Sequence, residues 1–373
     1  MKKNNNFILK NSLGMFDLIK GVMIIIVIIT HTYGLFEFDV ETEYLSELIS
    51  QINIFVLALL FIFKLMAEAT MPAFFLISGY GFRKTTMKKC LKKQFKLLLL
   101  PYIITMIIAT ILHFFSYWFL YKSIAGSKEQ TIKVLRGGVL GIPQDHDFHG
   151  YYFINCGPIW FLLGLAIAFL VFNFLINHFQ GKMLAVSVLI VSFIGWALCL
   201  LGPLPYSLSQ GLISVFYIWL GYYAKKHKLF ISPIKKGLGT IIVSLATLVY
   251  IVLVSTQSFF DMANDSYALG PISIIIHGFI GVAMIKIFLS LNRLNGFIST
   301  CFRRIGRFTL EILCIHSIEV IALGGYVQYL FYESWTGSPA LRSAIIIFTR
   351  IIVEISIAYI FVKIKKAILN KKS

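Results

Sequence analysis

The stretch FDLIKGVMIIIVIITHTYG, from Phe16 to Gly34, decides the fold class of this chain. It is an almost unbroken apolar run, yet it keeps Asp17, Lys20 and His31, which are costly to place in hydrocarbon. An α-helix needs roughly 20 apolar residues to cross the hydrocarbon core of a bilayer. The stretch therefore predicts a membrane-spanning helix whose ionisable side chains face a partner or a cavity.

The rest of the chain has the same character, because 58% of its 373 residues are hydrophobic and only 13% are charged. Such a composition is far from that of a soluble domain. We expect an all-α polytopic membrane protein that forms one integral-membrane domain over residues 1–373, with about ten transmembrane helices. The expected spans are 16–36, 55–82, 97–119, 158–176, 183–201, 208–224, 237–257, 269–290, 306–327 and 343–364.

The net charge of +18 is explained by membrane topology, and we expect no nucleic-acid partner. Most basic residues fall in segments that alternating spans place on one side of the membrane, and those segments contain no Asp or Glu. Basic residues concentrate in the cytoplasmic loops of membrane proteins. We therefore expect the lipid bilayer as the surroundings and both termini in the cytoplasm, as the short tails 1–15 and 365–373.

Two connections between expected spans are long. Residues 83–96 (RKTTMKKCLKKQFK) predict a basic helical continuation of the second and third spans, and residues 120–157 predict the longest external loop. Loops of that length are often functional. The histidines and aspartates of that loop are a weak metal signal, and the five cysteines lack CxxC spacing. We expect no metal site.

The polar residues of the first span share one side of the helix. Lys20 and His31 are eleven positions apart, which brings them within about 20° of one direction, and Asp17 lies within about 60° of it. The rise from Lys20 to His31 is about 16 Å, about half of the hydrocarbon thickness. An interfacial Asp17–Lys20 ion pair and a packing histidine are the structural alternatives. Because ionisable residues inside spans usually face a cavity or a partner, we favour a functional stripe.

Further ionisable residues lie inside the other expected spans. They are Lys64, Glu68, His277, Lys286, Glu311, His316, Glu319, Arg350 and Glu354. Lys64 and Glu68 are four residues apart, as are Arg350 and Glu354, so structural pairing on one helix face is the simplest interpretation. Glu68 is also close enough to the MPAFF stretch to face the same cavity as His31. The histidines of the eighth and ninth spans are more often packing residues than catalysts.

Four motifs occur in order along the chain. The most specific is a basic residue, ten residues and a histidine, Lys20 to His31; the others are MPAFFLISGYGF (Met71–Phe82), GPIWFL (Gly157–Leu162) and IGRFTLEILCIHS (Ile305–Ser317). Together they resemble the acyltransferase family 3 membrane proteins over nearly the whole chain. These bacterial transferases typically O-acetylate or O-acylate surface polysaccharides and glycolipids. The family often has an arginine where Lys20 stands, and lysine keeps the charge but not the planar fork.

The resemblance implies an acyltransferase of the bacterial cytoplasmic membrane, with acyl-CoA, usually acetyl-CoA, as the donor substrate and no permanently bound cofactor. The acceptor would be a carbohydrate or glycolipid hydroxyl on the far side of the membrane. The cations of residues 83–96 could attract the phosphates of CoA. An equally simple interpretation is that they set topology and bind anionic lipid.

Histidine suits the chemistry that the resemblance implies, because its ordinary pKa near 6.5 lies close to working pH. We expect His31 to take the proton of the acceptor hydroxyl. Glu68 is the first candidate for orienting its imidazole, and Asp17 the second, since about 21 Å of helix separates Asp17 from His31. The candidates for binding the donor are Lys20, Arg83, Ser78 and Trp160.

Two other classes of function fit a ten-span protein with a polar stripe. A transporter or exporter of a small polar solute or glycan precursor would line its route with such residues, without acyl transfer. A structural or sensory membrane protein would need no cavity between Lys20 and His31. Acceptor identity, acyl-chain length and oligomeric state have no motif in the sequence.

Overall fold

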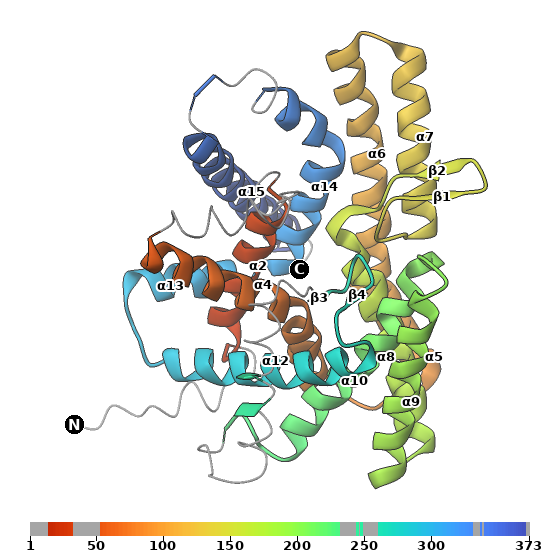
Figure 1. Cartoon of the computed structure of the whole chain (residues 1–373), viewed down its shortest axis with the longest axis vertical. Helices are drawn as coiled ribbons and strands as arrows, with labels where there is room; N and C mark the ends of the chain where they lie inside the picture. Colours follow the sequence, from red (N-terminus) through yellow and green to blue (C-terminus); the bar gives the residue numbers. More distant parts are fainter. Residues whose placement is uncertain are drawn as a thin grey trace.

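The computed structural model describes residues 14–32, 53–231, 244–245, 247–248, 260–330, 336–337 and 339–370, and it is helical almost throughout (Figure 1). The long helices are α2 (Asp17–Thr30), α4 (Ile54–Tyr80), α6 (Leu100–Tyr121), α7 (Ile124–Leu140), α8 (Trp160–His178), α9 (Gly181–Cys199), α10 (Leu208–Lys226), α12 (Pro271–Leu291), α14 (Thr309–Gln328) and α15 (Pro339–Asn370). The shorter helices are α5 (Met87–Gln94) and α13 (Phe297–Ile305). Two antiparallel hairpins pair β1 (His146–Phe148) with β2 (Tyr151–Phe153) and β3 (Phe260–Asp261) with β4 (Ser266–Tyr267).

Seven helices of the described residues are long and apolar enough to cross a membrane. They are Phe61–Tyr80, Met87–Tyr121, Gly157–His178, Gly181–Cys199, Pro271–Leu291, Thr309–Val327 and Leu341–Ile368. The chain is therefore an all-α, multi-pass membrane protein. The expected spans 16–36 and 208–224 correspond to α2 and α10, which are not among the seven, and the expected span 237–257 lies mostly outside the described residues.

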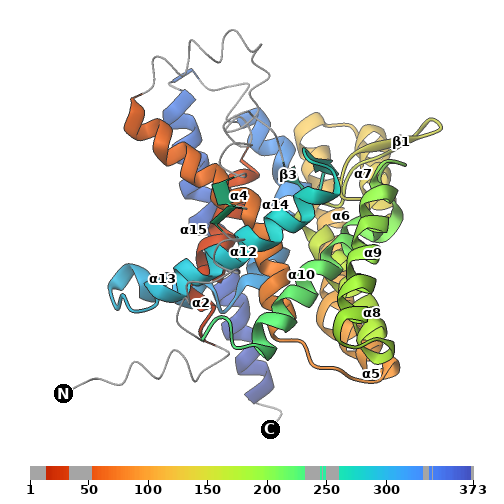
Figure 2. The same cartoon turned by 60° about the horizontal axis from the view of Figure 1, so that its bottom comes forward.

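Helix α2 lies in the middle of the helical bundle, where it contacts α4, α12, α13, α14 and α15 (Figure 2). Its crossing with α13 is close because two glycines face backbone. A Cβ on Gly21 would collide with the carbonyl oxygen of Phe302, and one on Gly306 would collide with that of Asp17. Small residues at such crossings let membrane helices approach closely. This contact brings the start of α2 against the residues that precede α14.

A second close crossing joins α4 to α10, which also packs against α8 and α9. A Cβ on Gly79 would meet the backbone of Ile218, and one on Gly221 would meet that of Leu76. The largest fully buried side chains around this crossing include Phe75 and Tyr217. The core around the crossing of α4 and α10 therefore consists of aromatic side chains beside backbone-to-backbone contacts.

Two expected connections are corrected by the structure. Helix α4 ends at Tyr80 and residues 81–86 are not helical, so only the third span continues into the basic segment, as one helix over Met87–Tyr121. The expected external loop 120–157 contains α7, which packs along α6. Tyr102 Oη donates to the Gly138 carbonyl over 2.6 Å, because α7 returns antiparallel along α6. Helices α6 and α7 therefore form a helical hairpin, and the β1–β2 ribbon follows it.

Candidate active site

His31 lies directly after α2, and its tautomer follows from one contact. Its Nδ1 is 2.8 Å from the Val27 carbonyl oxygen, one turn back on the same helix. A carbonyl oxygen only accepts hydrogen bonds, so Nδ1 carries the hydrogen and donates it. In the neutral imidazole, Nε2 then keeps a lone pair, and it has no hydrogen bond to the described residues. His31 is therefore presented as a proton acceptor through Nε2.

Arg350 of α15 holds the end of α2 in place. Its Nη1 donates to the His31 carbonyl oxygen over 2.7 Å and to Thr32 Oγ1 over 3.3 Å, and the Thr32 hydroxyl donates to the Ile28 carbonyl over 3.3 Å. The last carbonyls of a helix have no partner within the helix and carry partial negative charge. A buried guanidinium satisfies both needs, and it fixes the backbone from which the His31 ring projects.

The same arginine faces Glu319 of α14. Arg350 Nε and Nη2 both lie 3.1 Å from Glu319 Oε1, and the Arg350 side chain is only 4% exposed. A buried guanidinium bound to one carboxylate is the pairing that a low-dielectric interior requires. The pair links α14 and α15 directly beneath the end of α2.

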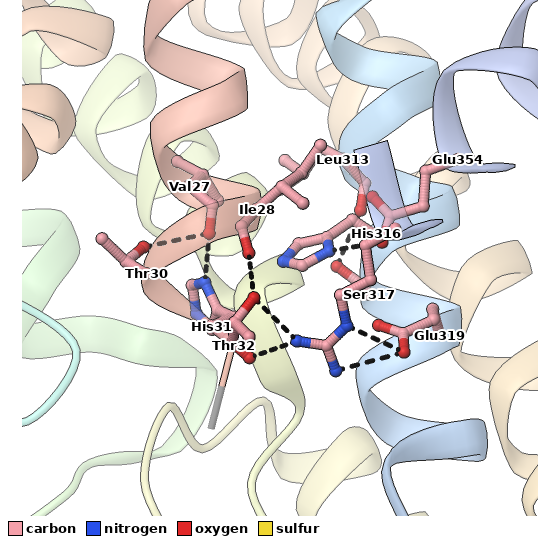
Figure 3. Close-up of polar contacts among 11 residues, drawn as sticks. Val27, Ile28, Thr30, His31, Thr32, Leu313, His316, Ser317, Glu319 and Glu354 are labelled. Atoms are coloured by element: carbon pink, nitrogen blue, oxygen red, sulfur yellow. Dashed lines mark hydrogen bonds and ion pairs between the residues drawn. The ribbon is translucent and has the colours of Figure 1, made fainter. Parts of the chain in front are cut away.

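A second histidine stands beside His31. His316 of α14 is fully buried, and its Nδ1 lies 3.0 Å from Glu354 Oε1 of α15 (Figure 3). The ring centroids of His31 and His316 are 5.2 Å apart, with the rings inclined at 75°. His316 Nε2 is buried and has no hydrogen-bond partner among the described residues. Two imidazoles therefore meet here, one oriented by a main-chain carbonyl and the other by a carboxylate.

Glu68 of α4 faces His277 of α12. Its Oε2 is 3.6 Å from His277 Nε2, and the His277 ring stacks on Phe260 with centroids 3.5 Å apart. Within the described part of the chain, no hydrogen bond or ion pair joins Glu68 to His31. The Val27 carbonyl is the hydrogen-bond partner that orients the His31 imidazole, the role for which we considered Glu68.

Asp17 and Lys20 form an ion pair at the other end of α2. Asp17 Oδ1 is 3.1 Å from Lys20 Nζ, and Asp17 Oδ2 accepts a hydrogen bond from Arg307 Nε over 3.0 Å. Asp17 thus lies between two cations, about 21 Å along the helix from His31. This contact accounts for a buried acid at the start of the span, and it places neither side chain beside the imidazole.

The three remaining candidates do not meet in one place. Ser78 lies in the last turn of α4 and Arg83 is exposed in the non-helical segment after it, next to Thr85, whose amide donates to Asn173 Oδ1 of α8 over 3.1 Å. Trp160 is buried at the start of α8, thirteen residues before Asn173, which is about 20 Å of helix. The structure therefore places Trp160 far from the segment that holds Arg83.

The β3–β4 hairpin carries two aspartates. Asp261 Oδ1 accepts hydrogen bonds from the amides of Ala263 and Asn264. Next to it, Asp265 accepts from Gln210 over 2.8 Å and from Gln144 over 3.1 Å. These bonds attach the hairpin to α10 and to the segment before β1.

Sequence reasoning missed the roles of Arg350, Glu319, Glu354 and Thr32. Thr32 gave no signal, whereas the other three were visible as ionisable positions, but we interpreted Arg350 and Glu354 as a pair on their own helix. Instead, Arg350 pairs with Glu319 and Glu354 with His316, across two helices. The same spacing that allows a pair within a helix also presents both residues to a neighbouring helix. We expected a carboxylate to orient His31, but the histidine that a carboxylate orients is His316, and the carboxylate is that of Glu354.

Comparison with known proteins gives the family. The sequence matches the acyltransferase-domain family, acyltransferase family 3, over residues 14–359. No curated protein and no solved structure matched the chain. The matched region covers α2 with Lys20 and His31, both close helix crossings, and the histidine cluster between α2, α14 and α15. The chain belongs to acyltransferase family 3, and it is a multi-pass membrane acyltransferase.

Proposed function

We propose that the protein transfers an acyl group, most simply acetyl, from cytoplasmic acyl-CoA to a hydroxyl of an extracytoplasmic carbohydrate or glycolipid. The family supplies the reaction class and does not favour the transport alternative. The observation that carries the proposal is the open Nε2 of His31, which the Val27 carbonyl leaves as a proton acceptor. No permanently bound cofactor is needed, and the site of action is the bacterial cell membrane.

The transfer step uses His31 as the general base. The acceptor oxygen attacks the thioester carbonyl carbon while its proton moves to His31 Nε2, and the bond between carbon and sulfur breaks to release CoA. The imidazolium keeps its Nδ1–H bond to Val27 and lies at the negative end of α2. Placing the base at a helix end held by Arg350 keeps Nε2 in one position during the reaction.

The donor side of the proposal rests on charge. The segment that follows α4 and helix α5 carry six exposed cations, Arg83, Lys84, Lys88, Lys89, Lys92 and Lys93. Lys20 lies at the same cytoplasmic end of the expected topology as this segment, paired with Asp17. CoA brings phosphates, which such a field attracts. We assign donor binding to Lys20 and Arg83, with Ser78 and Trp160 as further candidates along the route.

Purified protein in liposomes tests the assignment through the release of CoA thiol from acetyl-CoA in the presence of a sugar acceptor. His31→Ala is expected to lower turnover by about 10²- to 10⁴-fold, the usual contribution of a general base. His113→Gln is the matched control, because His113 is buried in α6 and contacts Thr131 outside the cluster. In cells, mass spectrometry of surface glycans should show the acyl mass increment with wild type and His113→Gln.

Unchanged turnover in His31→Ala would remove His31 from the mechanism. Solute flux through the liposomes without CoA release would contradict acyl transfer as a whole and return the transporter alternative. An acyl mass increment on surface glycans that also appears in cells without the protein would likewise contradict acyl transfer by this protein.

A further inference from the structure

The cluster around His316 buries two carboxylates but only one guanidinium. Glu319, Arg350, Glu354 and His316 lie between α14 and α15, and Arg350, Glu354 and His316 are each at most 5% exposed. Charged groups inside a membrane protein must be paired, because desolvation of an isolated charge costs several kcal/mol. The charge count of this cluster therefore constrains its protonation.

One pair is complete. Both Nε and Nη2 of Arg350 lie 3.1 Å from Glu319 Oε1, so this guanidinium and this carboxylate cancel. Glu354 remains, and its Oε1 lies 3.0 Å from His316 Nδ1. If His316 were neutral and Glu354 ionised, the cluster would bury one uncompensated negative charge. One additional proton on the His316–Glu354 pair makes the cluster neutral, as imidazolium with carboxylate or as imidazole with carboxylic acid.

A metal ion fits the same residues less well. The ligand atoms of His316, Glu319 and Glu354 lie within 4.8 Å of one another, which is a geometry that could surround a cation. A divalent ion would leave the cluster with a net positive charge, and Arg350 already occupies Oε1 of Glu319. The proton balances the charge without displacing the guanidinium.

The free end of His316 faces His31. In Figure 3 the His316 ring lies between Glu354 and α2, with the nitrogen that carries no dashed line on the side of α2. That atom, Nε2, is buried without a hydrogen-bond partner among the described residues, and the two rings are 5.2 Å apart. A proton held by the His316–Glu354 pair is thus available where His31 would act.

We propose that the His316–Glu354 pair is the general acid of the transfer, a role that rests on the proposed function of His31. As the acceptor oxygen bonds to the acyl carbon, its proton goes to His31 Nε2. As the bond between carbon and sulfur breaks, the sulfur takes the proton of His316 Nε2 and leaves as CoA thiol. The proton on His31 then passes to His316, which restores both groups, so that hydroxyl and thioester become ester and thiol with no net proton change.

The ionisable groups that act on His316 come from three helices. Glu354 and Arg350 belong to α15, Glu319 to α14 itself and His31 to the end of α2. The neighbouring helix α6 has one histidine, His113, and that ring contacts Thr131. The alkaline limb of a rate profile is therefore assigned to the loss of the proton that His316 and Glu354 share.

The test compares acetyl-CoA with its selenoester analogue, which keeps every other part of the donor and has a leaving selenolate that needs no acid. With wild-type protein, the turnover of acetyl-CoA is expected to fall at both low and high pH. The selenoester is expected to keep only the low-pH limb, which belongs to His31. An alkaline limb of equal size with both donors overturns the acid role without any variant.

His316→Gln and Glu354→Gln extend the comparison. Each is expected to slow transfer from acetyl-CoA by about 10²-fold and to leave transfer from the selenoester near the wild-type rate. His31→Gln should slow both donors, and His113→Gln neither. Equal losses with both donors in His316→Gln and Glu354→Gln, or wild-type rates with both, overturn the inference while leaving His31 intact as base. A stoichiometric metal in the wild type that is lost in Glu354→Gln also overturns it. Absence of wild-type transfer refutes the proposed function instead.

Discussion

The two histidines of the cluster differ in what holds them. His31 Nδ1 donates to a main-chain carbonyl of its own helix, whereas His316 Nδ1 meets a carboxylate from another helix. A carbonyl fixes the tautomer without adding a charge, while a carboxylate also stabilises the protonated ring. The residues that hold each ring therefore suit one histidine to accept a proton and the other to supply one.

Arg350 is the residue on which the position of His31 depends. A lysine in place of Arg350 would keep the charge. Without the planar guanidinium, it could not bind the His31 carbonyl and Glu319 together. We expect kcat to fall about 10- to 100-fold, while the KM for acetyl-CoA changes little because Arg350 contacts the end of α2 and Glu319, and not the basic residues after α4 to which we assign donor binding. Steady-state kinetics at saturating acceptor measure both constants.

Arg304→Lys provides the control for that substitution, because Arg304 is exposed on α13. It should retain the wild-type kcat. An Arg350→Lys variant that raises KM while kcat stays constant would instead assign Arg350 to substrate binding.

At the scale of the helices, the glycines of two motifs form the same contact between helices. Gly21 follows Lys20 in the first motif and Gly306 is the second residue of the fourth, and each faces the backbone beside the other where α2 meets α13. The contact sets the height of α14 relative to α2, and with it the distance between His316 and His31. The absence of side chains at this crossing is therefore required by the site as well as by the fold.

Gly306→Ala is expected to destabilise the protein by about 1–3 kcal/mol, because the new methyl group would collide with the Asp17 carbonyl oxygen and push α13 from α2. The Arg307–Asp17 ion pair should weaken in the same variant. Thermal unfolding in detergent measures the loss. Gly324→Ala is the control, since a Cβ there meets nothing within 4 Å and alanine favours a helix. Equal melting temperatures for the two variants would show that the crossing tolerates a side chain.

At the scale of the whole molecule, one carboxylate joins segments that are distant in sequence. Asp265 accepts hydrogen bonds from Cys199 of α9, Gln210 of α10 and Gln144 before β1, so it fastens the β3–β4 hairpin to the rest of the structure. Burial raises the pKa of Asp265 from its usual 3.8 to about 6. The Asp265 carboxyl therefore holds its proton up to a higher pH in the folded state than in the unfolded chain.

This shift makes stability fall as pH rises through that range. Because the folded pKa lies above the unfolded one, the contribution of Asp265 is fully present below about pH 4 and is lost as pH rises through about 6. The loss amounts to at most about 3 kcal/mol. Asp265→Asn should flatten this part of the dependence, measured as melting temperature from pH 4 to pH 8 relative to wild type. A wild-type curve that rises across this interval relative to the variant would contradict the assignment.

The sequence predicted what depends on local pattern. The expected span 269–290 matches α12 at 271–291 because a long apolar run leaves a helix few alternatives in a bilayer. Helix α7 was missed, since residues 124–140 are polar and part of their packing comes from Tyr102 and His113 of α6. In the site, the stripe of α2 could be read from spacing, but the bond from Arg350 to His31 joins residues 319 positions apart. Such contacts depend on how helices assemble.

The shortness of α2 links the reaction to the thickness of the lipid around it. Its 14 residues span about 21 Å, whereas the hydrocarbon core measures about 30 Å. In the topology expected from the sequence, Asp17 lies at the inner boundary and His31 stops about 9 Å below the outer one. The extracytoplasmic acceptor hydroxyl that we propose must then descend below the headgroups, or the bilayer must thin locally to meet it, which costs only fractions of a kcal/mol per Å. Lipid composition thereby becomes part of the geometry in which an acceptor meets its base.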